Sequence, residues 1–178
     1  MTLYLGIDPG TQGALCLLVP ESKGRVWFCD TPQTKNLYET LLKIHNWFRH
    51  MQYPLYAAIE DVHSMGGMGA KSNFQFGRNL GLVEAITHLQ PWADKIEYVQ
   101  PKVWQKGCGI VFQYPNEMST PHRAALRKRT VAKHALELYP KAEIYGPRGG
   151  LKDGRSDALM IAHYLRLKYE GVQNGTKT

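Results

Sequence analysis

The sequence predicts an α/β fold built around one mixed β-sheet. Three short apolar segments near the N-terminus, at residues 3–8, 13–19 and 24–30, have the composition and spacing of strands. A segment with helical periodicity at 35–51 separates them from a fourth strand at 55–60. A helical crossover lets the fourth strand return parallel to the first. The sheet should therefore combine antiparallel and parallel pairs.

The first three strands should form an antiparallel meander. The first of them, LYLGID, alternates, with Leu3, Leu5 and Ile7 on one face and Asp8 at its end on the other. This alternation is typical of a half-buried strand. A short polar turn joins the second strand to the third, as in a hairpin.

A long helix should follow the fourth strand, with Ser72 as its N-cap and Gln75 as the capping-box partner. Gly77 and Gly81 lie on one stripe of this helix. Glycine inside a helix costs about 1 kcal/mol relative to alanine. Two of them indicate that another backbone approaches closely, either the sheet or a dimer partner.

The second half of the chain predicts one more strand and two helices. The strand lies near IEYVQ at 96–100, and a basic helix begins at Pro121. The last helix contains DGRSDALMIAHYLRLKY. Its apolar stripe should face the sheet and consists of Ala158, Ile161, Ala162 and Leu165.

Length and composition favour a single domain over residues 1–170, with a loose tail at 171–178. The chain has 178 residues, of which 43% are hydrophobic, and no apolar run approaches the roughly 20 residues of a membrane span. Its three cysteines form no CxxC pair, which favours core thiols in a reducing compartment. We therefore expect a soluble, cytoplasmic protein without a structural zinc.

The net charge favours an anionic partner. Lys and Arg number 22 against 15 Asp and Glu, giving a formal charge of +7. A basic surface attracts nucleic acid, although many basic proteins bind none.

Four acidic residues occupy positions where a metal site could form. Asp8 and Glu60 each end a strand, and Asp153 and Asp157 lie one turn apart on the last helix. Taken singly, Asp8 could shape a turn, and the helical pair could complement the helix dipole. Taken together, they would repel one another strongly unless a divalent cation neutralised them. The all-oxygen donor set favours Mg²⁺, with Mn²⁺ able to substitute, over zinc.

A basic protein with clustered carboxylates suits phosphodiester hydrolysis. Two metal ions about 3.5–4 Å apart would activate the attacking water and stabilise the leaving 3′ oxygen. Such a mechanism requires no nucleophilic side chain. The surrounding positive surface would offset the repulsion between the acids and DNA.

The motifs LGIDPGTQGA, AAIEDVHSMGGMGAKSNFQFG, QPKVW and KDGRSDALMIAHY resemble those of RuvC-type Holliday junction resolvases, in detail the phage-encoded branch. The resemblance implies a ribonuclease H-like fold, a five-stranded mixed sheet with helices on both faces. It implies a Mg²⁺-dependent homodimer that makes symmetric paired nicks in four-way DNA junctions, in the cytoplasm of a phage's host. The implied catalytic and metal-binding residues are Asp8, Glu60, Asp153 and Asp157.

One departure from the family concerns the last two acids. The bacterial enzymes space them three residues apart, whereas here Gly154 follows Asp153 and the spacing is four. Asp153 could therefore have a modified role. The family's dimer helix maps to residues 73–89, and its aromatic wedge to Phe74 or Phe76, of which Phe74 is preferred because Phe76 lies on the apolar stripe.

The resemblance also implies a lysine close to the scissile phosphate, which matches Lys128, and a second that matches Lys102 or Lys106. A solvated helix face is the alternative for the arginines near Lys128. The candidate DNA-binding residues are Lys71, Phe74, Arg78, Lys102, Lys106, Arg123, Arg127 and Lys128.

The sequence leaves three alternatives to a junction resolvase. GIDPGTQGA also resembles the phosphate-binding hairpin of sugar kinases and actin-like proteins, but those need two such domains and a second phosphate motif. A non-catalytic branched-DNA-binding protein is the second alternative. The third is a nuclease of the same fold that acts mainly on flaps, replication forks or RNA hybrids.

Overall fold

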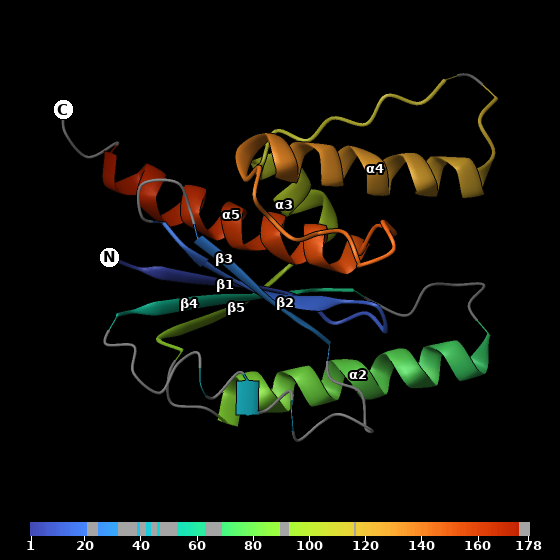
Figure 1. The fold of residues 1–178 in the computed structure, drawn as a ribbon. Helices are drawn as coiled ribbons and strands as arrows, with labels where there is room; N and C mark the ends of the chain where they lie inside the picture. Colours follow the sequence, from blue (N-terminus) through green and yellow to red (C-terminus); the bar gives the residue numbers. More distant parts are fainter. Residues whose placement is uncertain are drawn as a thin grey trace.

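A computed structural model describes residues 1–20, 25–31, 53–62, 69–89, 93–115 and 117–174, together with the single positions 39, 42, 43 and 46. Five strands form one sheet in the order β3-β2-β1-β4-β5 (Figure 1). Their bounds are β1 Leu3–Asp8, β2 Ala14–Val19, β3 Arg25–Asp30, β4 Leu55–Glu60 and β5 Lys95–Val99.

The pairing is mixed, as the sequence predicts. Strand β2 pairs antiparallel with both β1 and β3, whereas β4 pairs parallel with both β1 and β5. Ile7 of β1 lies opposite Ile59 of β4. The last residues of these two strands, Asp8 and Glu60, therefore lie at the same edge of the sheet. The helix expected at 35–51 lies outside the described residues, apart from four isolated positions.

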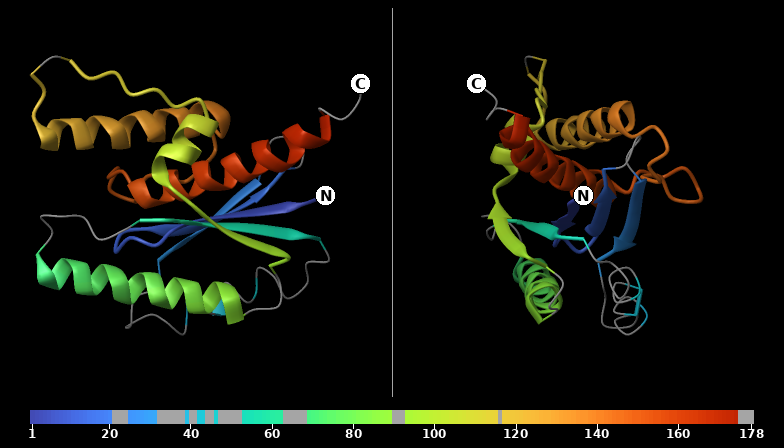
Figure 2. Two further views of the ribbon diagram at one scale, coloured as in Figure 1. Left: turned by 180° about the vertical axis from the view of Figure 1, so that it is seen from behind. Right: turned by 90° about the vertical axis from the view of Figure 1, so that its left-hand side faces the viewer.

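Helices cover both faces of the sheet (Figures 1 and 2). Helix α2 lies on one face, and α5 lies on the other with α3 and α4 beside it. Their bounds are α2 Ala70–Leu89, α3 Pro101–Gly107, α4 Thr120–Leu138 and α5 Asp153–Asn174. None of the described helices is long and apolar enough to cross a membrane.

The central strand β1 is buried on both faces, so the expectation of a half-buried strand was wrong. Leu5 packs in the core beneath α2 and is 0% exposed, and Tyr4 packs in the core beneath α5 and is 1% exposed. The reason is position: β1 is the middle strand, and helices cover both of its sides.

Helix α5 rests directly on β1 through a glycine. A Cβ atom at Gly6 would lie 2.0 Å from the carbonyl oxygen of Ala158 and 2.4 Å from the backbone nitrogen of Ala162. The predicted apolar stripe of α5 is fully buried in this contact. This close packing fixes where the first turns of α5 meet the end of β1.

Helix α2 differs from its prediction at its start and along its glycine stripe. It begins at Ala70, because the carbonyl oxygen of Gly69 already accepts the backbone N–H groups of Ser72 and Asn73. Ser72 is therefore inside the helix and is not its N-cap. Gly77 and Gly81 have no atom of the described chain within 4 Å of a Cβ position, so the sheet does not approach them.

Two further differences concern α3 and α5. The seven-residue helix α3 was not expected, because its short sequence, PKVWQKG, contains both proline and glycine. Helix α5 continues to Asn174, past position 171 where the tail was expected to begin. Cys16, Cys29 and Cys108 are free and buried, as predicted.

Candidate active site at the carboxyl ends of β1 and β4

The four predicted acids lie together at one edge of the sheet. Asp8, Glu60 and Asp153 line a single cavity of about 630 Å³. Asp157 follows one turn later on α5, where the charges of Asp8, Glu60 and Asp153 raise its pKa. The folding of β1, β4 and the start of α5 thus joins acids that are up to 149 positions apart in the chain.

Asp8 also shapes the turn that follows β1. Its Oδ1 accepts the backbone N–H of Gly10 at 2.8 Å, and the Thr31 hydroxyl donates to its backbone carbonyl at 3.2 Å. The turn is closed by the backbone N–H of Gly13, which donates to the carbonyl oxygen of Gly10 at 2.9 Å. Shaping a turn and facing the cavity are therefore compatible roles for Asp8.

Gly154 lets the first turn of α5 touch the β1–β2 turn. Gly13 and Gly154 form an isolated parallel bridge. A Cβ atom at Gly154 would lie 2.2 Å from the carbonyl oxygen of Gln12 and 2.5 Å from the Cα of Gly13. Gly154, which follows Asp153 in the chain, thus lets the start of α5 contact the turn that follows Asp8.

Burial and mutual repulsion raise the pKa values of three of the acids. The pKa of Glu60 is raised to about 7, first by burial and then by the charge of Asp8. The pKa of Asp8 is raised to about 6, mainly by burial, with the Gly10 hydrogen bond opposing the rise and Asp153 adding to it. Burial and the charges of Asp8, Glu60 and Asp153 raise the pKa of Asp157 well above its ordinary value.

A lysine and a tryptophan contact these acids from outside the group. The Lys128 ammonium lies 2.5 Å from Oδ2 of Asp153, and this hydrogen bond raises the pKa of Lys128. The Trp104 indole donates to Oε1 of Glu60 at 2.9 Å, in a fully buried contact. The cavity therefore combines clustered carboxylates with a cation at its wall.

The residues present fit a hard divalent cation. All four acids offer oxygen donors, which Mg²⁺ prefers. Oδ1 of Asp157 is buried and has no hydrogen-bond partner among the described residues. Within those residues, no group of three or more His, Cys, Asp or Glu already has the arrangement of a metal site. Trp104 and Lys128 hold one oxygen each of Glu60 and Asp153.

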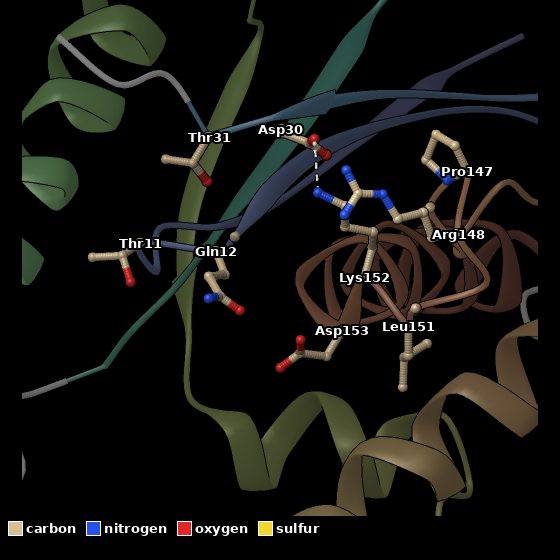
Figure 3. A pocket seen from close by; sticks show the side chains of 12 residues that line it. Thr11, Gln12, Asp30, Thr31, Pro147, Arg148, Leu151, Lys152 and Asp153 are labelled. Carbon is tan, nitrogen blue, oxygen red and sulfur yellow. Dashed lines mark ion pairs between the residues drawn. The ribbon is translucent and has the colours of Figure 1, made fainter. Parts of the chain in front are cut away.

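A second cavity of about 550 Å³ adjoins the first and shares its residues 11–13 and Asp153. Figure 3 shows Asp153 at this cavity with Arg148 and Lys152 above it. Lys152 lies 3.6 Å from Asp30 in an ion pair. The acids are therefore flanked by a polar hollow that carries two cationic side chains.

The predicted DNA-binding residues fall into three places. Lys71 and Lys128 line the cavity with the acids. Arg78 and Phe74 are exposed on α2, and Lys102 and Lys106 are exposed on α3. Arg123 and Arg127 are exposed on the N-terminal half of α4.

The two wedge candidates differ in exposure. Phe74 is 73% exposed, more than any other large hydrophobic residue of the described chain. Phe76 is half-buried and lines the cavity beside Glu60. Exposure thus favours Phe74 as a free aromatic surface, and Phe76 as a wall of the site.

Sequence reasoning assigned no role to Trp104, Arg148 or Lys152. A buried tryptophan usually finds an acceptor for its indole N–H, but its partner lies 44 residues away and no spacing rule identifies it. Arg148 and Lys152 lie on a glycine-rich loop whose path depends on the Tyr145–Leu151 bridge. Only the folded chain reveals these three neighbours of the acids.

The fold matches solved structures of RuvC. A structure titled "T. thermophilus RuvC in complex with Holliday junction substrate" aligns with a TM-score of 0.57 and 17% identity, over 95% of this chain and 96% of that one. The chain has the RuvC fold. A second Thermus thermophilus RuvC structure aligns with a TM-score of 0.52 and 19% identity, over 93% of this chain and 96% of that one.

The ribonuclease H-like fold class and the five-stranded mixed sheet are thereby confirmed. The first of these RuvC structures was solved in complex with a Holliday junction substrate. No family model matches the sequence, and no curated protein sequence matches it either.

Proposed function

We propose that the protein is a structure-selective endonuclease that resolves Holliday junctions and other branched DNA by metal-assisted hydrolysis. The observation that carries this proposal is the meeting of Asp8, Glu60 and Asp153 in one cavity, with Asp157 beside them, on a RuvC fold. The formal charge of +7 supports an anionic substrate. The junction complex of the RuvC neighbour supports branched DNA in particular.

The residues have separate roles in this proposal. Asp8, Glu60 and Asp157 hold Mg²⁺ or Mn²⁺, because their repulsion is relieved by a cation. Asp153 contributes either to the metal or to the placement of Lys128, with which it is paired. Lys128 lies at the cavity wall, where its ammonium can bind a phosphate oxygen.

When bound, magnesium supplies Lewis acidity toward a phosphodiester and lowers the pKa of a water. The chain itself fixes the position of its carboxylates. Gly10 holds one oxygen of Asp8, and the buried Trp104 holds one oxygen of Glu60. Oδ1 of Asp157 has no hydrogen-bond partner among the described residues, which leaves it available to a metal. We expect two-metal hydrolysis with symmetric paired nicks.

Paired nicks require two active sites, and we propose a homodimer formed through α2. Open space beside Gly77 and Gly81 supports this, because a second helix could approach there. Replacing Gly81 with Trp should convert the dimer to a monomer in sedimentation velocity, while Gly171→Trp, at another open glycine, should not. A wild type that sediments as a monomer at micromolar concentration would contradict the two-site arrangement.

The proposal extends to the origin of the protein, its cellular location and its DNA-contacting residues. We place the protein in the phage-encoded branch, acting on DNA in the host cytoplasm, on the sequence motifs described above. The exposed basic residues of α2, α3 and α4 are assigned to DNA contact on their charge and exposure.

The deciding experiment compares substrates side by side. The purified protein is incubated with Mg²⁺ or with EDTA and with labelled four-way junctions, flaps, forks, RNA–DNA hybrids and linear duplex. We expect Mg²⁺-dependent nicks at symmetric positions of the junction and little cleavage of linear duplex. Faster cutting of flaps, forks or hybrids would favour a related nuclease, and binding without any cleavage would favour a non-catalytic DNA-binding protein.

A further inference from the structure

An extended segment between α3 and α4 carries two aromatic rings stacked under two arginines. The chain from Cys108 to Pro115 runs beside α4 to the N-terminal end of that helix (Figures 1 and 2). The guanidinium of Arg127 lies 5.2 Å from the ring centre of Phe112, and that of Arg123 lies 5.5 Å from the ring centre of Tyr114. The two rings are 6.3 Å apart at an angle of 17°. We call these four residues the arginine–aromatic ladder.

The two rings have the spacing of an extended segment, and the two arginines have the spacing of a helix. Phe112 and Tyr114 are two residues apart in an extended segment, so they lie on the same side of it. Arg123 and Arg127 are four residues apart in α4, so they lie on one helical face, about 6 Å apart along its axis. The two arginines therefore form a row, and the two rings form a second row beneath it.

The ladder is exposed and has excess positive charge. Both arginines are exposed, and neither forms an ion pair within the described part of the chain. No acid occurs in α4 before Glu137. Cations in the first turns of a helix oppose the helix dipole, so the stability of α4 does not explain their placement.

The ladder begins beside the candidate active site. The Arg127 guanidinium lies 3.5 Å from the side-chain oxygen of Gln105, the neighbour of Trp104, which bonds Glu60. The charge of Arg127 lowers the pKa of Glu60 against the larger effects of burial and Asp8. The next residue, Lys128, pairs with Asp153. From there the ladder leads outward along α4 to Arg123 and Tyr114.

Stacking on a ring leaves an arginine free to bind an anion. Each guanidinium carbon lies over a ring at more than 5 Å from its centre, and a guanidinium has five N–H donors, so donors remain that can bind a phosphate bidentately. The alternative is that the stacking only fastens the segment to α4, since an exposed cation–π pair is worth about 0.5–1 kcal/mol. That alternative does not explain why neither cation has an acidic partner among the described residues, or why Arg127 lies close enough to Glu60 to affect its pKa.

We propose that the arginine–aromatic ladder binds the phosphate backbone of one duplex arm of the DNA and guides that arm toward the carboxylates. This inference rests on the proposed function, because the arm belongs to a branched substrate. Arg127 contacts the phosphate nearer the cavity and Arg123 the one farther out. The rings hold the two guanidinium planes in place before DNA arrives.

The test measures DNA affinity without cleavage. Fluorescence anisotropy with a labelled four-way junction and a labelled linear duplex, in EDTA and over a salt series, gives the slope of log K against log salt. Arg123→Ala with Arg127→Ala should lower that slope by about 1.8 on both probes, since each phosphate contact contributes about 0.9. Phe112→Leu with Tyr114→Leu should weaken binding several-fold while changing the slope little, because the charges remain.

Arg129→Ala is the matched control, because it removes the same charge from another face of α4, where Arg129 lines a separate hollow. Its slope should stay close to that of the wild type. Equal slopes for Arg129→Ala and for the Arg123→Ala/Arg127→Ala variant would overturn the proposal, as would a wild-type slope in the Arg123→Ala/Arg127→Ala variant. Weakening confined to a labelled single strand, run as a third probe under the same conditions, would overturn it too, because the rings would then bind bases.

Nicking assays keep the two claims distinct. A wild type that binds duplex through the ladder but never nicks a junction with Mg²⁺ would overturn the proposed function and leave the ladder intact. Normal junction nicking by the wild type, with an unchanged salt slope in the Arg123→Ala/Arg127→Ala variant, would overturn the ladder and leave the proposed function intact.

Discussion

Opposing influences act on the carboxyl group of Glu60. Burial and the charge of Asp8 favour its protonated form, whereas the Trp104 hydrogen bond and the charge of Arg127 favour the carboxylate. The result is a pKa of about 7, close to neutral pH. A group poised in this way is typical of functional sites. Small changes in its surroundings should therefore be visible in activity.

Replacing Trp104 with Phe keeps an aromatic ring in the core and removes the indole N–H that reaches Glu60. Loss of a hydrogen bond worth about 1 kcal/mol should raise the pKa of Glu60 by about 0.7 units. Because the proposed function requires Glu60 as a carboxylate, the acid limb of the pH–rate profile for junction nicking at subsaturating Mg²⁺ should move upward. An unmoved acid limb, in a variant that folds normally, would show that this hydrogen bond does not tune the site.

At the scale of elements, the site depends on how α5 meets the β1–β2 turn. Gly13 and Gly154 let the two backbones touch, and Gly6 lets the middle of α5 lie on β1. These contacts decide the distance between the helical acids and Asp8. Replacing one of these glycines should therefore affect nicking activity as well as stability.

Gly154→Ala should disturb the site, because its Cβ would meet backbone atoms of Gln12 and Gly13. We expect a loss of nicking of about 100-fold, since a displacement near 1 Å can have that effect. Gly150→Ala, where the new Cβ meets nothing within 4 Å, is the control and should nick normally. Circular dichroism of both variants separates misplacement from unfolding, and full activity in folded Gly154→Ala would refute the contact's importance.

The strands and the long helices were predictable from the sequence because their periodicity is regular. The meander, the parallel pairing of β4 with β1 and the buried stripe of α5 follow from alternation and helical spacing. Helix α3 was not predictable, because it has only seven residues. The start of α2 was not predictable either, because the helix begins at Ala70 and the expected cap, Ser72, lies inside it. The four acids were identifiable at their element ends, but the Trp104 contact and the role of Gly154 depend on tertiary packing.

At the scale of the whole molecule, the acid cluster should lower stability at neutral pH. Asp8, Glu60 and Asp157 have pKa values raised above those of unfolded carboxyl groups. The folded state therefore binds more protons than the unfolded state between about pH 4 and pH 7. This contribution to stability is present at low pH and is lost as the pH rises through about 6 to 7.

Two linked outcomes follow for thermal unfolding. At pH 7.5 without divalent ions, Asp157→Asn should raise Tm by about 5 °C, because it removes a buried charge from the cluster. Addition of Mg²⁺ should raise Tm of the wild type and raise that of the variant less. Differential scanning calorimetry at pH 5 and pH 7.5 checks both. A variant that is less stable than the wild type, with an undiminished Mg²⁺ response, would contradict the repulsion argument.

The central claim is that the gathered carboxylates cut DNA, and Asp8→Asn tests it most directly. Junction nicking by this variant should fall by about three orders of magnitude or more, since the lost charge stabilisation is worth several kcal/mol. Junction affinity in EDTA should be unchanged or higher. Glu137→Gln, an exposed acid on α4, should nick as the wild type does. Wild-type nicking by Asp8→Asn would contradict the account.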